Sequence, residues 1–143
     1  MYKKAFTLLE VLIVMAIVGI MAAATLPYTA KSYKHYIKTV ETKNLISVLR
    51  RAQSMAMANT LESNYGVKIS STSAILFKGT SYATHDAQYD ENYPISSTVT
   101  ISAPSEIVFE KISGRPATTA TITITSDNKT QKIIVGREGN IDW

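Results

Sequence analysis

The stretch that decides the fold is KKAFTLLEVLIVMAIVGIMAAATLP, residues 3–27. Two lysines open it, and Glu10 is the only charged side chain between Phe6 and Leu26. As an α-helix, this apolar run rises roughly 31 Å, which matches the hydrocarbon thickness of a bilayer. A carboxylate in hydrocarbon costs roughly 2.5 kcal/mol or more, so the position of Glu10 requires a specific reason.

A helical pattern resumes after Pro27 and continues to about Asn59. Apolar and aromatic residues recur there at spacings of three and four, with one gap of five, and mark one face of an amphipathic helix. That face consists of Tyr33, Tyr36, Ile37, Val40, Leu45, Val48, Leu49, Ala52 and Met55. A proline inside a helix removes one backbone hydrogen bond and kinks the helix. The sequence therefore predicts one long helix, about 6–59, bent near Pro27.

Beyond Asn59 the apolar period changes to two, which is typical of half-buried strands rich in β-branched residues. The alternating segments are 65–69, 75–77, 99–101, 108–112, 122–124 and 133–135. Hairpin turns are expected at SDNK (126–129) and STS (71–73), and a polar loop at 80–94. Short, closely spaced strands favour an antiparallel sheet packed on the amphipathic half of the helix, which makes the fold class α+β.

Composition narrows the function classes. The chain has no cysteine, so disulfides and thiolate metal sites are excluded. The net charge is +4, but residues 31–51 carry six basic side chains against one acidic, and residues 52–143 sum to −2. The basic balance therefore belongs to the helix and says little about nucleic acid binding by the rest. No nucleophile elbow, zinc motif or phosphate loop occurs, so we expect neither enzymatic activity nor a cofactor.

The segment KKAFTLLE (3–10), followed by an apolar helix and Pro27, resembles the N-terminus of type IV pilin-like proteins. The family pattern is a short basic leader, a small residue, and then Phe-Thr-Leu-x-Glu. Residues 122–135 and 139–141 resemble, more weakly, the H-type pseudopilins of type II secretion and the FimT-like minor pilins.

The resemblance implies that a prepilin peptidase cuts between Ala5 and Phe6 and that the new Phe6 amine is methylated. The family usually has glycine before the cut, where this chain has Ala5. Subunits then leave the membrane and stack into a helical filament, either a type IV pilus or a type II secretion pseudopilus. The implied partners are other pilin or pseudopilin subunits, the peptidase, the membrane platform of the assembly machine and the lipid bilayer.

The resemblance also implies the domain organisation. Residues 1–5 are a leader peptide, 6–27 a hydrophobic transmembrane and filament-core helix, 28–59 the amphipathic half of the same helix, and 60–143 a β-rich head. We expect a single-pass protein of the cytoplasmic (inner) membrane whose head is extracytoplasmic before it enters the filament. A cleaved secretory signal is the competing interpretation, but its apolar region is typically shorter, about 7–15 residues.

The Phe6 amine that cleavage creates would explain why a carboxylate, Glu10, lies in an apolar segment. Two buried opposite charges offset their desolvation only when they pair closely. Residues 6 and 10 lie one helical turn apart, but the amine of a neighbouring subunit is the more useful partner because that pairing fixes axial register. We therefore expect Glu10 to drive assembly. The competing interpretation is a glutamate that snorkels to the headgroups or is protonated near the membrane edge.

Gly19 and Pro27 are the candidates for local melting of the helix during assembly. Glycine lowers helix propensity by about 1 kcal/mol, and proline removes a backbone hydrogen bond. The alternative is an ordinary kinked helix with a close-packed glycine.

Two other functions compete with filament assembly. DNA-binding FimT-like pilins carry a Gly-Arg-x-Arg element, but the aligned residues here are GNID (139–142), which lack both arginines. Nucleic acid is therefore not an expected partner. The other function is that of a permanently anchored extracytoplasmic domain that never polymerises.

The polar loop is a weak candidate for a calcium site. His85, Asp86, Asp90 and Glu91 cluster there. Their spacing matches no defined calcium loop, so we expect a solvated acidic loop and no metal.

Overall fold

The computed structural model describes residues 7–143, and the side chains of all of these except residues 24–31. The processing residues Ala5 and Phe6 lie outside the described residues. The chain divides into two compact units, Met1–Tyr33 and Lys34–Trp143, which are described separately.

Helix α1 runs from Leu8 to Met57 and contributes to both units. The expected long helix of about 6–59 is therefore confirmed over the described residues. Its assignment is continuous through Pro27, and the bend there stays a prediction. Asn59, with a left-handed φ of 51°, follows the helix and prevents its continuation, as asparagine commonly does at this position.

The strands of the described chain form two four-stranded antiparallel sheets. The first has the order β3-β2-β1-β5 and consists of Glu91–Pro94, Ser73–Lys78, Tyr65–Ile69 and Glu106–Phe109. The second has the order β4-β6-β7-β8 and consists of Thr100–Ser102, Ala120–Ser126, Lys129–Val135 and Ile141–Asp142. Short 3-10 helices lie in the connecting segments: η1 (Thr60–Glu62), η2 (Tyr82–Thr84) and η3 (Ala87–Tyr89).

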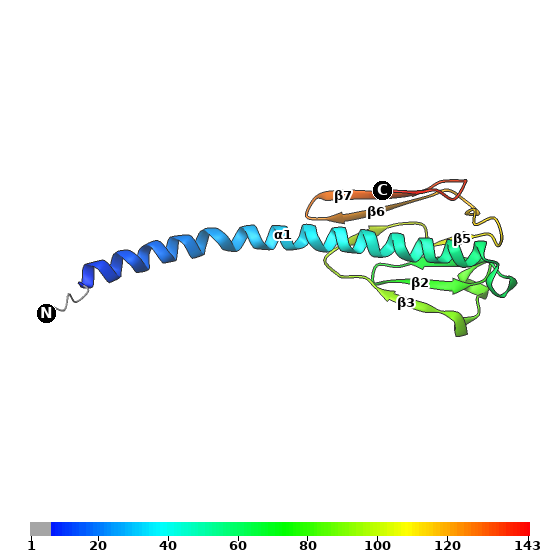
Figure 1. Ribbon diagram of the computed structural model, residues 1–143, viewed down its shortest axis with the longest axis horizontal. Helices are drawn as coiled ribbons and strands as arrows, with labels where there is room; N and C mark the ends of the chain where they lie inside the picture. The colour runs from blue at the N-terminus through cyan, green and yellow to red at the C-terminus, as the bar shows by residue number, and fades with distance from the viewer. Residues whose placement is uncertain (1–6) are drawn as a thin grey trace. The chain divides into compact units, whose positions relative to one another are not determined.

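The part of α1 in the second unit lies along strands of both sheets (Figure 1). It contributes Leu45, Val48, Leu49, Ala52 and Ala56 to the buried core. The two sheets contribute their own buried side chains, which include Tyr65, Val67, Leu76, Ile107, Phe109, Ile122, Ile124, Ile133 and Val135. The fold is α+β, with a helix packed on antiparallel sheets, as the change of apolar period indicates.

The hairpin expected at residues 126–129 is confirmed. Ser126 pairs with Lys129 across β6 and β7, and the two residues between them, Asp127 and Asn128, have φ values of 50° and 59°. Two consecutive left-handed residues define a turn whose twist matches that of the flanking strands. Asp and Asn tolerate this conformation better than other side chains do.

Three details of the predicted sheet were wrong. The loop expected at 80–94 ends in a strand, β3, which pairs with β2 and carries Pro94 at the sheet edge, where a missing N–H is tolerated. The strand expected at 108–112 ends at Phe109, and Ile112 is exposed with a φ of 70°. The strands also divide between two sheets instead of forming a single one.

A hydrogen-bonded ion pair between Arg51 and Glu91 joins α1 to the edge strand β3. The Arg51 guanidinium donates from Nε to Oε2 of Glu91 at 2.9 Å and from Nη2 to Oε1 at 2.7 Å. The Tyr93 hydroxyl donates to the same Oε2 at 2.5 Å. These hydrogen bonds, that of Arg51 first and that of Tyr93 second, lower the pKa of the Glu91 carboxyl below its ordinary value of 4.5, against the opposing effect of burial.

The lowered pKa of Glu91 predicts a pH-dependent stability. Because the unfolded chain binds the proton more readily, the stabilisation is complete above about pH 4.5 and is lost as the pH falls through the folded pKa. Replacement of Glu91 with Gln should therefore flatten the decline in the free energy of unfolding below that pH. Urea denaturation at a series of pH values measures this free energy of unfolding. The exposed Glu62→Gln variant is the matched control. An unchanged acid slope for Glu91→Gln would contradict this prediction.

Candidate assembly site on the N-terminal helix

The first turn of α1 is capped by Thr7. The Glu10 N–H donates to the Thr7 carbonyl at 3.1 Å and to the Thr7 hydroxyl at 3.3 Å, and the Val11 N–H donates to the same carbonyl at 3.3 Å. Thr7 is thus the N-cap residue and Glu10 occupies the third helical position. The spacing Thr-x-x-Glu is the sequence of a capping box, a signal that the sequence analysis missed.

The capped turn gives Glu10 a local role within its own subunit. A carboxylate in the first turn of an exposed helix interacts favourably with the unpaired N–H groups and the helix dipole, by about 0.3–1 kcal/mol. That role does not depend on a second subunit. It is separable from charge pairing, because glutamine can also occupy the third position of a capping box.

The surface beside Glu10 is apolar. An open groove of about 300 Å³ is lined by Glu10, Val11, Val14 and Met15. The large apolar side chains from residue 8 to residue 21 are exposed, and they lie on every side of the helix: Leu8, Leu9, Val11, Leu12, Ile13, Val14, Met15, Ile17, Val18, Ile20 and Met21. A helix that is apolar all round is typical of a segment buried in a protein core or a bilayer.

Gly19 lies inside this apolar segment. A Cβ added at Gly19 meets no atom within 4 Å among the described residues. Packing within the described subunit therefore does not require a glycine at this position. The side chain of Pro27 lies outside the described residues, and the melting role of both positions stays a prediction.

Over the part of the chain that the structure describes, no helix has both the length and the apolar character needed to cross a membrane.

The carboxylates of the polar loop are engaged by protein groups. Asp90 Oδ2 lies 3.0 Å from His85 Nε2, and the Asp86 side chain accepts a hydrogen bond of 3.2 Å from the Gln88 N–H. Glu91 is held by Arg51. Within residues 7–143, the described side chains include no group of three or more His, Asp or Glu residues placed to hold a metal ion.

Residues 139–142, which align with the DNA-binding element of FimT-like pilins, contact other parts of the same protein. Asn140 Nδ2 donates to Asp142 Oδ2 at 2.6 Å, and Ile141 is buried. Arg137, the nearest arginine, precedes Glu138 and is exposed.

A comparison with protein families gives a match at the N-terminus of the chain. A family model described as the prokaryotic N-terminal methylation motif matches residues 1–26. This motif is the prepilin signal of type IV pilin-like proteins, and its match supports a prepilin-type N-terminus in this chain. No curated protein and no solved structure matches the chain. The match includes Thr7, Glu10 and Gly19 and does not extend to the β-rich head.

Proposed function

We propose that the protein is a structural subunit of a type IV pilus or of a type II secretion pseudopilus. The observation that supports this most strongly is the methylation motif at residues 1–26, which includes the beginning of α1, where the exposed side chains are apolar on all sides except at Glu10. The motif favours a structural subunit over an enzyme. The subunit is processed between Ala5 and Phe6 and methylated on the Phe6 amine.

The apolar segment serves in two environments in turn. Before assembly, residues 6–27 anchor the subunit as a single-pass protein of the cytoplasmic membrane, and the head, residues 60–143, faces away from the cytoplasm. In the filament, neighbouring subunits cover the same apolar side chains. The exposed apolar surface supports both states, because each removes it from water.

Glu10 determines how the subunit docks when it moves from the membrane into the filament. Glu10 lines the open apolar groove together with Val11, Val14 and Met15. Entry of a neighbouring Phe6 amine beside that groove pairs two charges that are costly apart in an apolar medium. A shift of one subunit along the filament axis breaks the pair, and the pairing therefore fixes register.

Within this class we assign the chain to the H-type minor subunits. The assignment rests on the weak similarity of residues 122–135 and 139–141 to that group. The absence of cysteine supports it, because a major pilin often carries a disulfide-closed loop. The partners are other pilin or pseudopilin subunits, the prepilin peptidase and the membrane platform of the assembly machine.

Processing tests the first step of this proposal. When the full chain is incubated in detergent with an active prepilin peptidase, its intact mass should fall by the mass of residues 1–5. An Ala5→Leu variant should stay uncut, because the pocket before the cut accepts a small residue, whereas Ala5→Gly should be cut at least as fast as the wild type. If the wild-type chain keeps Met1 while a known prepilin is cut in the same mixture, the proposal fails.

A further inference from the structure

The second unit carries an open groove that the proposed function does not use. It has a volume of about 640 Å³ and lies between α1 and the residue that follows β8. Its lining consists of Lys43, Ile46, Ser47, Arg50, Arg51 and Trp143. Volumes of this size are typical of sites that receive a small ligand or a few residues of a peptide.

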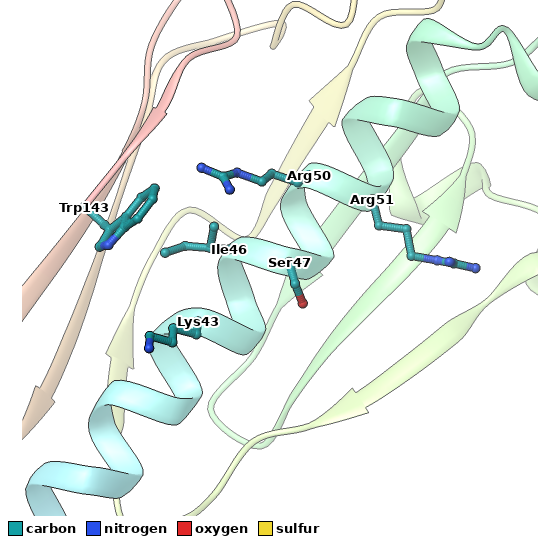
Figure 2. A pocket seen from close by; sticks show the side chains of 6 residues that line it. All are labelled: Lys43, Ile46, Ser47, Arg50, Arg51 and Trp143. Atoms are coloured by element: carbon teal, nitrogen blue, oxygen red, sulfur yellow. The ribbon is translucent and has the colours of Figure 1, made fainter.

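Three helix side chains face the indole of Trp143. Figure 2 shows Lys43, Ile46 and Arg50 extending from successive turns of α1 toward Trp143. Residues three and four apart are neighbours on a helix surface. The Arg50 guanidinium carbon lies 5.0 Å from the centroid of the indole ring, within the range of a cation–π interaction. The groove therefore combines a flat aromatic wall with two cations.

The three cations that line the groove differ in whether they already form an ion pair within the protein. Arg51 extends away from Trp143 in Figure 2 and is neutralised by Glu91. Lys43 and Arg50 form no ion pair with any described residue, and no aspartate or glutamate side chain lines the groove. Trp143 is 60% exposed. Exposed tryptophan and arginine are the residue types most enriched where binding energy concentrates in protein interfaces.

We propose that this groove binds an acidic segment of a partner protein. A carboxylate of the segment accepts hydrogen bonds from the Arg50 guanidinium, which suits bidentate recognition, and a second carboxylate pairs with Lys43. An apolar side chain of the segment packs on the indole of Trp143. This inference rests on the second unit alone and does not depend on processing or on Glu10.

Charge favours an acidic peptide over a nucleic acid. Two unpaired cations match one or two carboxylates, whereas a phosphate backbone presents a long, regular array of charges that needs an extended basic track. Asp142, which precedes Trp143, is exposed, and residues 52–143 sum to −2. On the strand side of the groove, a long polyanion would meet the exposed carboxylate of Asp142.

The fluorescence of Trp143 provides a direct test, because it is the only tryptophan in the chain. The full chain in a non-ionic detergent is titrated with a short peptide rich in aspartate and glutamate that contains one leucine. We expect a saturable change in emission that added salt weakens. The same peptide with asparagine and glutamine in place of its acids should produce no saturable change.

Matched variants identify the residues. The double variant Lys43→Gln with Arg50→Gln should weaken binding of the acidic peptide by roughly tenfold, the loss of two exposed charge pairs. The control, Lys129→Gln with Lys132→Gln, removes the same charge from exposed positions of β7 and should bind like the wild type. Circular dichroism checks that all variants are folded.

Three results would overturn the proposal. The first is the absence of a saturable change with the acidic peptide. The second is equal binding by the wild type and the Lys43–Arg50 double variant. The third is tighter binding of a single-stranded oligodeoxythymidine than of the peptide through the same two cations, which would identify the groove as a nucleic acid site.

Discussion

Replacement of Glu10 with Gln is expected to remove the protein from filaments while leaving it processed and in the membrane. The change leaves the Phe6 amine of the neighbouring subunit in an apolar environment without its partner, and breaking a buried pair in this way costs about 3–5 kcal/mol. That cost corresponds to a loss of incorporation of roughly two to four orders of magnitude. The measurement is the amount of the subunit in sheared filaments relative to membranes, by quantitative immunoblot in the native host.

The capped first turn of α1 supplies the controls for this experiment. The glutamine introduced by Glu10→Gln can still serve in the capping box, so helix initiation is preserved and only the charge is lost. Thr7→Ala does the opposite, because it removes the hydroxyl that accepts from the Glu10 N–H and keeps the carboxylate. Loss of this cap costs about 0.5–2 kcal/mol, so its effect on incorporation should be much smaller. Equal incorporation of Glu10→Gln and wild type would refute the pairing.

Replacement of Leu49 with Ala is expected to destabilise the second unit by about 2–5 kcal/mol. Leu49 is fully buried in the core that α1 shares with both sheets. Truncation removes apolar contacts and leaves a cavity that the surrounding strands only partly fill. Chemical denaturation of the full chain in detergent, followed by circular dichroism, measures the change in the free energy of unfolding.

A second substitution on the same helix serves as the control for Leu49. Ser54 is exposed on α1, and Ser54→Ala should change the free energy of unfolding by no more than about 0.5 kcal/mol. If Leu49→Ala were as stable as Ser54→Ala, α1 would not be an integral part of the core. The head would then fold without the helix.

The local elements of the fold could be predicted from the sequence because apolar periodicity reports them directly. The spacing of Leu45, Val48, Leu49 and Ala52 predicts a buried helix face, and all four side chains are buried. That face does not extend to its expected beginning, since Tyr36 is exposed. Periodicity gives the face of an amphipathic helix but not the point where the sheets stop covering it.

The partition of the strands could not be predicted in the same way. Alternation identifies a strand without identifying its neighbours, and so the division into two sheets was missed. β3 was missed because it is short and ends in Pro94, and both features are typical of an edge strand. Its attachment through Glu91 to Arg51 joins residues that are distant in sequence, and no local pattern indicates that contact.

The two candidate sites also differ in how far the sequence alone could reveal them. The Thr7 cap is a local feature, and the Thr-x-x-Glu spacing alone could have revealed it. The groove at Trp143 is not local, because β8 must pair with β7 before the indole can lie opposite Arg50. Lys43, Ile46 and Arg50 by themselves indicate only part of a basic amphipathic helix.

The intact mass of the protein in sheared filaments and in membranes tests the central claim most directly. Assembly after processing predicts a filament-borne chain that begins at Phe6 and carries one methyl group on its amine, with any uncut chain confined to the membrane. A chain that begins at Met1 in the membrane and is missing from the filaments would contradict the claim. The protein would then be an anchored domain that does not assemble.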